Sequence, residues 1–139
     1  MANWLLFAIL SAVFAALTAV FAKAGLKNVN PDLATAIRTV IILFMTWGIV
    51  FFKGVQKTSG LSKQNWIFLI LSALATGMSW LFYYRALQAG EVSKVSIIDK
   101  SSLILTILLA FIFLKEPLTW RVAAGGCLMV AGILVTVWK

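Results

Sequence analysis

Five long apolar stretches, separated by short polar gaps, constrain this chain more than any other feature. Each stretch has about the 20 residues that an α-helix needs to cross a bilayer, and the stretches cover residues 4–22, 30–52, 66–89, 93–114 and 118–138. Of the 139 residues, 63% are hydrophobic and only 12% are charged, which is too few charges to surround the core of a small water-soluble protein. We therefore predict an all-α membrane protein with five transmembrane helices.

The start of the second stretch carries a local helix signal, Asn30-Pro31-Asp32. Asparagine is a good helix cap, proline suits the first helical position, and aspartate is favourable at the positive end of the helix dipole. The sequence therefore predicts a helix that begins at Pro31.

The reactive side chains of the chain argue against an enzyme. There is one cysteine, Cys127, there is no histidine, and there are four carboxylates, so a multi-thiolate metal site is excluded and the commonest catalytic base is absent. The net charge of +8 comes from basic residues that stand singly between apolar runs, which is not the clustered pattern of a nucleic-acid-binding face. We expect no cofactor, no metal and no nucleic-acid partner.

The basic residues in the gaps are almost evenly divided between the two sides of the membrane. If the amino terminus and the second and fourth gaps share one side, that side carries five basic residues and the other side carries four. The first group is Lys53, Lys57, Lys63, Lys115 and Arg121, and the second is Lys23, Lys27, Lys94 and Lys139. Because basic residues set orientation, this balance permits dual topology, in which copies insert both ways and pair head to tail. One fixed orientation, set by weaker cues, is the alternative.

Four charged residues lie inside the spans: Arg38, Arg85, Asp99 and Lys100. Charges within a membrane are costly and tend to mark solute or ion pathways. At about 1.5 Å of rise per residue, all four lie ~7–10 Å from a helix end and nearer the same membrane face. Together they predict a polar vestibule with a formal charge of +2, which favours an anionic or zwitterionic solute over a bare cation.

The two arginines allow structural interpretations as well. Arg85 is close to the end of its span, so snorkelling or pairing with Glu91 is favoured for it. For Arg38, a role in the pathway and a structural pair with Asp99 are equally supported.

The fourth span is amphipathic although it lies in lipid. Polar side chains surround Asp99 over about half of the helical wheel, at Ser93, Ser96, Lys100, Ser102 and Thr106. Polar groups facing hydrocarbon without a partner are costly, so this half should face water or protein. We therefore predict a solute cavity that includes Asp99, Lys100, Ser96 and Thr106.

The first and third spans carry mixed stripes of aromatic and hydroxyl side chains. The stripes are Phe7, Ser11, Phe14, Thr18 and Phe21 in the first span, and Ser72, Thr76, Ser79, Trp80 and Tyr83 in the third. From these we select Phe14, Thr18, Ser79, Trp80 and Tyr83 as candidate substrate contacts. Ordinary packing, with the hydroxyls bonded to their own backbone, is an equally supported interpretation.

The fifth span is rich in small residues. Ala123, Cys127 and Ala131 are four residues apart, and Gly125 and Gly132 are seven apart. Small residues let helices approach closely, so we predict that these five form a dimer interface. A contact within one chain is the alternative.

Short motifs in the second half of the chain point to a family. They are Trp80-Leu81-Phe82-Tyr83-Tyr84-Arg85-Ala86-Leu87, Val92-Ser93, Leu114-Lys115-Glu116-Pro117-Leu118-Thr119, Gly125-Gly126 and Gly132. With these motifs the chain resembles the EamA family of the drug/metabolite transporter superfamily, over its whole length and in its number of spans. Residues 1–139 are accordingly interpreted as a single EamA-like transmembrane domain.

Most EamA relatives join two five-helix halves of opposite orientation, so the resemblance implies that this chain is one half of such an inverted repeat. It also implies an antiparallel homodimer in the cell (inner) membrane and secondary export of small metabolites or drugs. Related small multidrug exporters carry a carboxylate in the first helix for proton exchange, whereas residues 1–30 here contain none. Asp99 is therefore our candidate for proton coupling, and a capping role is favoured for Glu116.

These observations favour a transporter that works by alternating access as an inverted two-fold dimer. The small-molecule site would lie among the first four spans, and the fifth would form the dimer interface. Two alternatives remain open: a flippase for lipid-linked sugars and a non-transporting subunit of a larger membrane complex.

Overall fold

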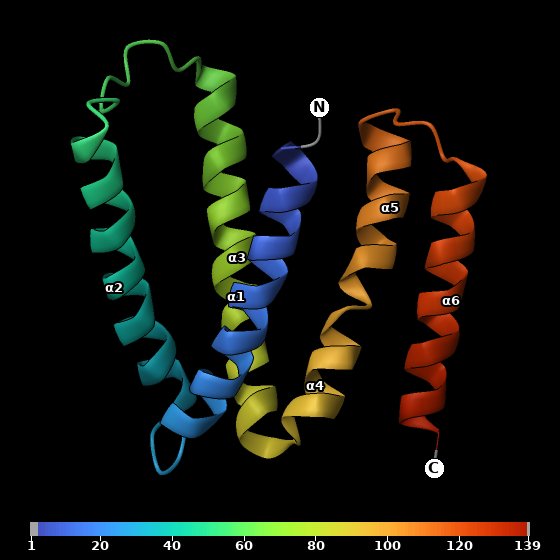
Figure 1. The fold of residues 1–139 in the computed structure, drawn as a ribbon. Coiled ribbons are helices and arrows are strands. Elements are labelled where there is room, and N and C mark those ends of the chain that lie inside the picture. Colours follow the sequence, from blue (N-terminus) through green and yellow to red (C-terminus); the bar gives the residue numbers. More distant parts are fainter. Residues whose placement is uncertain (1–2, 139) are drawn as a thin grey trace. The chain divides into compact units, whose positions relative to one another are not determined.

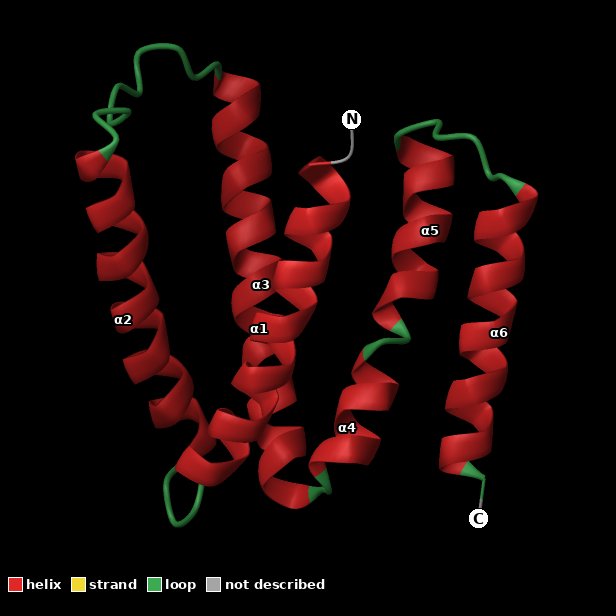
Figure 2. Cartoon of the chain, viewed as in Figure 1, coloured by secondary structure: helices red, strands yellow, loops and turns green. Residues whose placement is uncertain are grey.

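The computed structural model describes residues 3–138, which form helices joined by turns and loops (Figures 1 and 2). The described residues contain α1 (Asn3–Gly25), α2 (Pro31–Phe52), α3 (Lys63–Ala89), α4 (Val92–Asp99), α5 (Ser102–Phe113) and α6 (Trp120–Val137). Five spans among them are long and apolar enough to cross a membrane, with α4 and α5 together forming one span, Val92–Phe113. The predicted all-α membrane fold is therefore confirmed. Lys139, which we counted in the charge balance, lies outside the described residues.

The chain forms two compact units, one up to Ala89 and one from Gly90 onward. In the first unit α3 packs against both α1 and α2, and the three helices come together near the turn that joins α1 to α2 (Figure 1). The buried side chains of this unit gather at that end and are Ala19, Ala22, Leu26, Thr35, Tyr84 and Leu87.

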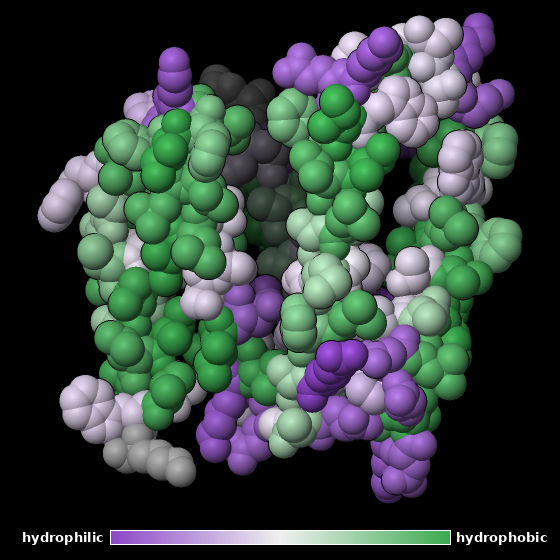
Figure 3. Space-filling model, turned by 180° about the vertical axis from the view of Figure 1, so that it is seen from behind, coloured by the Kyte–Doolittle hydropathy of each residue, from purple (hydrophilic) through white to green (hydrophobic). Residues whose placement is uncertain are grey.

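Large apolar side chains elsewhere on the helices face outward (Figure 3). Phe44 of α2 and Trp4 of α1, for example, are 73% and 74% exposed. Apolar surface on this scale is expected of helices whose surroundings are lipid. The small core near the α1–α2 turn therefore holds the first unit together, and lipid or further protein covers the remainder.

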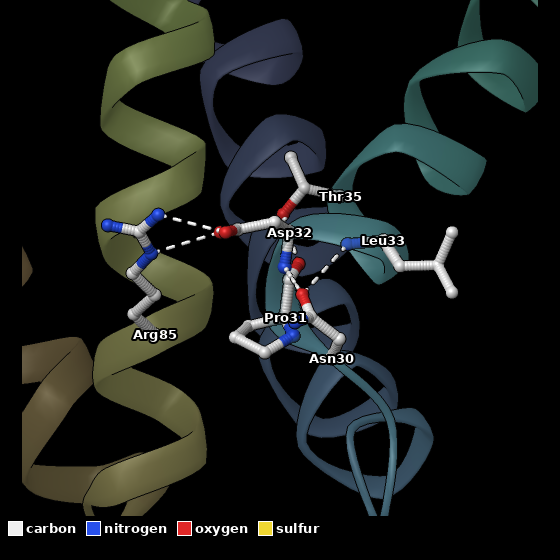
Figure 4. Close-up of polar contacts among 6 residues, drawn as sticks. All are labelled: Asn30, Pro31, Asp32, Leu33, Thr35 and Arg85. Atoms are coloured by element: carbon white, nitrogen blue, oxygen red, sulfur yellow. Dashed lines mark hydrogen bonds and ion pairs between the residues drawn. The ribbon is translucent and has the colours of Figure 1, made fainter.

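Asn30 caps α2 as predicted (Figure 4). Its Oδ1 accepts hydrogen bonds from the backbone N–H groups of Asp32, at 2.8 Å, and Leu33, at 3.3 Å. Pro31 is the first helical residue, where its missing N–H costs nothing. The local signal read from the sequence thus fixes where α2 begins.

Replacing Asn30 with alanine should lower the free energy of unfolding by about 1 kcal/mol, because two N–H groups lose their acceptor. The melting temperature in detergent measures the effect. Asn65→Ala is the matched control, because Asn65 lies inside the first turn of α3 and is not a cap. Equal melting temperatures for the two variants would contradict a capping role.

The fourth span, predicted over residues 93–114, lies at Val92–Phe113, and its helix is interrupted at Lys100 and Ser101. There the N–H of Ser101 bonds to the carbonyl of Ile98 at 2.9 Å, and the N–H of Leu103 bonds to that of Lys100 at 3.0 Å. Such three-residue bonds tighten the chain into a 3₁₀-type turn. The carboxylate of Asp99 consequently lies at the end of one half-helix, directly before the interruption.

The second unit is built by α6 packing against α4 and α5. Thr119 caps α6, since its hydroxyl accepts a hydrogen bond from the N–H of Val122 at 3.4 Å. The backbone N–H of Glu116 donates to the carbonyl of Ala110 at 3.3 Å, at the end of α5, and a capping role for its carboxylate stays a prediction. Gly126 is the small residue that faces α5, where an added Cβ would lie 3.8 Å from Ile107 Cδ1.

The five residues predicted at the dimer interface lie on α6. Gly125, Cys127, Ala131 and Gly132 are exposed and Ala123 is half-buried. A role in a dimer stays a prediction for all five.

Candidate functional site

Arg38 is held against two aromatic rings of α3. Its guanidinium carbon lies 4.3 Å from the centre of the Trp80 ring and 5.4 Å from that of Tyr84. Both distances are within cation–π range. The structure thus brings together Arg38 and Trp80, two of the residues selected from the sequence, and adds Tyr84, which was not selected.

A cavity of about 470 Å³ lies beside Arg38, between α1 and α2. This size is within the range of about 300–1,000 Å³ that is usual for small-molecule sites. We call it the Arg38 cavity. It is lined by Thr18, Phe21, Ala22, Gly25, Val29, Ala34, Ile37, Arg38, Ile41, Ile42 and Tyr84.

Apart from Val29 in the α1–α2 turn and Tyr84 of α3, the walls of the Arg38 cavity are one stripe from each of two helices. On α1 they follow the spacing i, i+3, i+4 and i+7 from Thr18, and on α2 they follow the same spacing and i+8 from Ala34. Residues at this spacing share one face of a helix. The signal that could have found them is the apolar stripe around Arg38, which an analysis of charged and hydroxyl residues alone passes over.

Arg38 has no carboxylate partner within the first unit. The sole acidic residue before Gly90 is Asp32, and Arg85 holds it through two hydrogen bonds, Nε to Oδ1 and Nη2 to Oδ2, each 2.9 Å long (Figure 4). The prediction that Arg85 pairs with Glu91 is therefore wrong, and Glu91 pairs with Lys94 at 3.0 Å. Packing of α2 on α3 brings Asp32 to Arg85 as a bidentate partner. The two residues are 53 positions apart in the sequence, so their pairing could not be predicted from proximity along the chain.

The threonine hydroxyls of the two stripes, and that of Thr106 in the fourth span, are bonded to their own helices. Thr18 donates to the carbonyl of Phe14 at 2.8 Å, and Thr106 donates to that of Ser102 at 2.9 Å. These bonds match the packing alternative. Thr18 nevertheless lines the Arg38 cavity, where its oxygen can still accept a hydrogen bond.

Four selected residues of the first unit are not among the cavity walls: Trp80, which contacts Arg38, and Phe14, Ser79 and Tyr83. Phe14 is exposed on α1, and Ser79 is exposed on α3. Tyr83 is half-buried and meets Tyr84 edge to face, with ring centres 6.4 Å apart. Their predicted contact with a substrate stays a prediction.

Four selected residues lie in the second unit, along α4 and α5. Lys100 Nζ is 3.5 Å from Asp99 Oδ2 at the helix interruption, and Ser96 is one turn earlier, where its carbonyl accepts from the N–H of Lys100 at 3.3 Å. Thr106 lines a smaller hollow of about 180 Å³, together with Glu116.

Polar side chains tie the three helices of the first unit together near the α1–α2 turn. Besides the Asp32–Arg85 pair, Lys23 Nζ donates to the carbonyl of Leu87 at 2.6 Å, and Gln88 Nε2 donates to that of Val29 at 2.8 Å. We call Lys23, Asp32, Arg85 and Gln88 the turn cluster. It holds α1, α2 and α3 together at the end of the cavity where Gly25 and Val29 form the wall.

Comparisons with known proteins agree with the resemblance noted in the sequence. The chain is 46% identical over 134 residues to an uncharacterized transporter encoded in the cobO 3′ region of a Sinorhizobium species, covering 96% of this chain and 95% of that protein. It is 30% identical over 132 residues to the uncharacterized transporter YvbV of Bacillus subtilis (strain 168), covering 92% of this chain and 42% of YvbV. No solved structure matches the chain.

The model of one protein family, described as the EamA-like transporter family, matches residues 2–138. The match extends through all five membrane spans. The chain therefore belongs to the EamA-like transporter family.

Proposed function

We propose that this protein is a secondary carrier that exports small anionic or zwitterionic metabolites or drugs across the cell membrane through the Arg38 cavity. The observation that carries the proposal is a guanidinium without a carboxylate partner in its own unit, beside a mostly apolar cavity of about 470 Å³. Family membership makes the chain a membrane transporter of the drug/metabolite type and not an enzyme. Its five apolar spans make it a multi-pass membrane protein.

The charge of Arg38 selects the class of solute. A cation inside a membrane is costly without a counter-charge, and contact with the Trp80 and Tyr84 rings leaves the N–H groups of the guanidinium able to donate. A solute with a carboxylate or a similar anionic group would bind those donors, whereas a bare cation would be repelled.

A tryptophan introduced into the cavity wall should block transport. Ile42 lines the Arg38 cavity, and its neighbour Leu43 on α2 does not, so Ile42→Trp and Leu43→Trp form a matched pair. Uptake of labelled phenylacetate and phenylalanine into proteoliposomes measures the effect. We expect flux with Leu43→Trp and none above protein-free vesicles with Ile42→Trp. Equal flux through both variants would place the route elsewhere, and no flux by the parent protein would oppose a carrier for these classes.

We further propose that two copies pair in opposite orientations, so that each supplies one half of an alternating-access carrier. The nearly level charge balance and the exposed small residues of α6 support this arrangement. The chain spans 42% of the length of YvbV, which is consistent with a second half being supplied by another copy.

Cross-linking can measure the direction of pairing. Ala123 and Ala131 lie four residues before and after Cys127, so in an antiparallel contact centred on Cys127 each would meet the other. In a Cys127→Ala background, we expect Ala123→Cys to form disulfides with a differently tagged Ala131→Cys copy. Disulfides between two Ala123→Cys copies would instead indicate parallel pairing.

Asp99 is the proposed coupling group, because its carboxylate lies at the interruption of a membrane span, 3.5 Å from Lys100. Discontinuous spans are a recurrent setting for ion sites in transporters. Replacing Asp99 with asparagine should leave solute exchange across the membrane intact and remove its acceleration by a proton gradient. Full acceleration in the variant would exclude this role.

A further inference from the structure

The geometry points to amphiphilic monoanions as the solutes of the Arg38 cavity, meaning molecules with one carboxylate on an aromatic or branched apolar body. This inference rests on the proposed function and narrows its substrate class. It separates such molecules from the zwitterions, dianions and cations that a transporter of this family could otherwise carry.

Arg38 is the single charged residue among those that line the cavity, and Asp32, the sole acidic residue of the first unit, is occupied by Arg85. Lys23 donates to the carbonyl of Leu87 and is not among the lining residues. One guanidinium balances one carboxylate. A second negative charge, or a separate ammonium group, would have to lie against apolar walls such as Phe21 and Ile41, where a charge without a partner is costly.

The donors of Arg38 face no competing hydrogen-bond acceptor from the two rings that hold it. Trp80 and Tyr84 contact Arg38 through their rings, and Tyr84 is only 4% exposed, so one of the two rings is fixed by the core. A cation–π contact uses none of the N–H groups of a guanidinium in ordinary hydrogen bonds, so they stay available to a ligand. A planar carboxylate can accept two of these N–H groups at once.

The remaining walls of the cavity carry no further charge. The hydroxyl of Thr18 donates to the carbonyl of Phe14 at 2.8 Å, so it offers a ligand an acceptor and gives an anion no second donor. Most of the other lining residues are alkyl or aromatic, including Phe21, Ile37 and Ile42. Apolar walls with a few fixed polar groups are typical of sites that take up an apolar body and orient it by one polar end.

The test uses the full chain in lipid nanodiscs, with binding measured by calorimetry against empty nanodiscs. Five probes share a phenyl ring and differ in charge: phenylacetate, phenylacetamide, phenethylamine, phenylalanine and phenylsuccinate. We expect phenylacetate to bind most tightly and its neutral isostere phenylacetamide roughly ten- to a hundredfold more weakly, which is the usual effect of losing a hydrogen bond between two charged groups.

Three variants assign the preference to Arg38. Arg38→Gln should abolish the difference between phenylacetate and phenylacetamide, and Arg38→Lys should retain part of it because the charge remains without the planar edge. Lys57→Gln, which removes one positive charge from the α2–α3 loop, should leave the difference unchanged. Size-exclusion chromatography verifies that each variant is folded, and the comparison of probes on the parent protein does not depend on any variant.

Tighter binding of phenylalanine, phenylsuccinate or phenethylamine than of phenylacetate by the parent protein would overturn the inference. So would a preference for phenylacetate that survives in Arg38→Gln. Neither result would by itself overturn the proposed carrier, which fails only if Ile42→Trp leaves flux intact or if the parent moves none of the solutes.

Discussion

Replacing Leu87 with alanine is expected to lower the free energy of unfolding by about 2 kcal/mol. Leu87 is fully buried, with 0% of its surface exposed, at the end of the first unit where the core gathers. In soluble proteins the same change costs about 2–5 kcal/mol, part of which is the transfer of the side chain to water. Lipid and detergent are as apolar as leucine, so in this protein the cost should come chiefly from the lost packing contacts and lie near the lower limit.

Unfolding in mixed micelles with increasing denaturing detergent measures this loss. Leu71→Ala is the matched control, since Leu71 lies on the same helix and is 55% exposed; its removal should have a small effect. A Leu87→Ala variant as stable as Leu71→Ala would show that the helices of the first unit are not held by the core near the α1–α2 turn.

The sequence was most informative where the signal is local. The length of each apolar stretch predicts its span, and Asn30-Pro31-Asp32 predicts the start of α2, because capping and the fixed backbone angle of proline act within a few residues. Both predictions are confirmed by the structure. Neither depends on what the helix packs against.

Predictions that depend on tertiary contacts were wrong or incomplete. Arg85 was paired with Glu91 by proximity along the chain, whereas the fold brings Asp32, 53 residues away, into bidentate contact. The interruption at Lys100 and Ser101 carries no glycine or proline, and these are the usual sequence signals for a broken helix. Polarity alone indicated that this region differs from an ordinary span.

The candidate functional site could be predicted from the sequence in part. The position of Arg38 inside a span marked it as unusual, and Trp80 was selected with it, but Tyr84 was passed over in favour of Tyr83. Only the packing of α2 on α3 shows which of two adjacent tyrosines meets the guanidinium. A charge in the membrane can thus be found from sequence, whereas the rings that hold it require the fold.

Breaking the Asp32–Arg85 pair should lower the melting temperature more than breaking any other ion pair among the described residues. The pair joins α2 to α3 through two hydrogen bonds of 2.9 Å (Figure 4). Asp32→Asn or Arg85→Gln would leave the other charge without its partner at the turn cluster, where a membrane offers few substitutes. The Glu91–Lys94 pair has one contact of 3.0 Å between two exposed side chains three residues apart, so Glu91→Gln, its matched control, should change little.

A charge swap separates the pair itself from the positions of its members. Asp32→Arg combined with Arg85→Asp restores opposite charges, yet it places a cation in the first turn of α2, where the helix dipole favours an anion. We therefore expect the double variant to recover part of the melting temperature lost by each single variant and not all of it. A swap no better than the single variants would mean that Asp32 acts through α2 alone. Full recovery would mean that the dipole contributes nothing, and that joining α2 to α3 is the whole role of this pair.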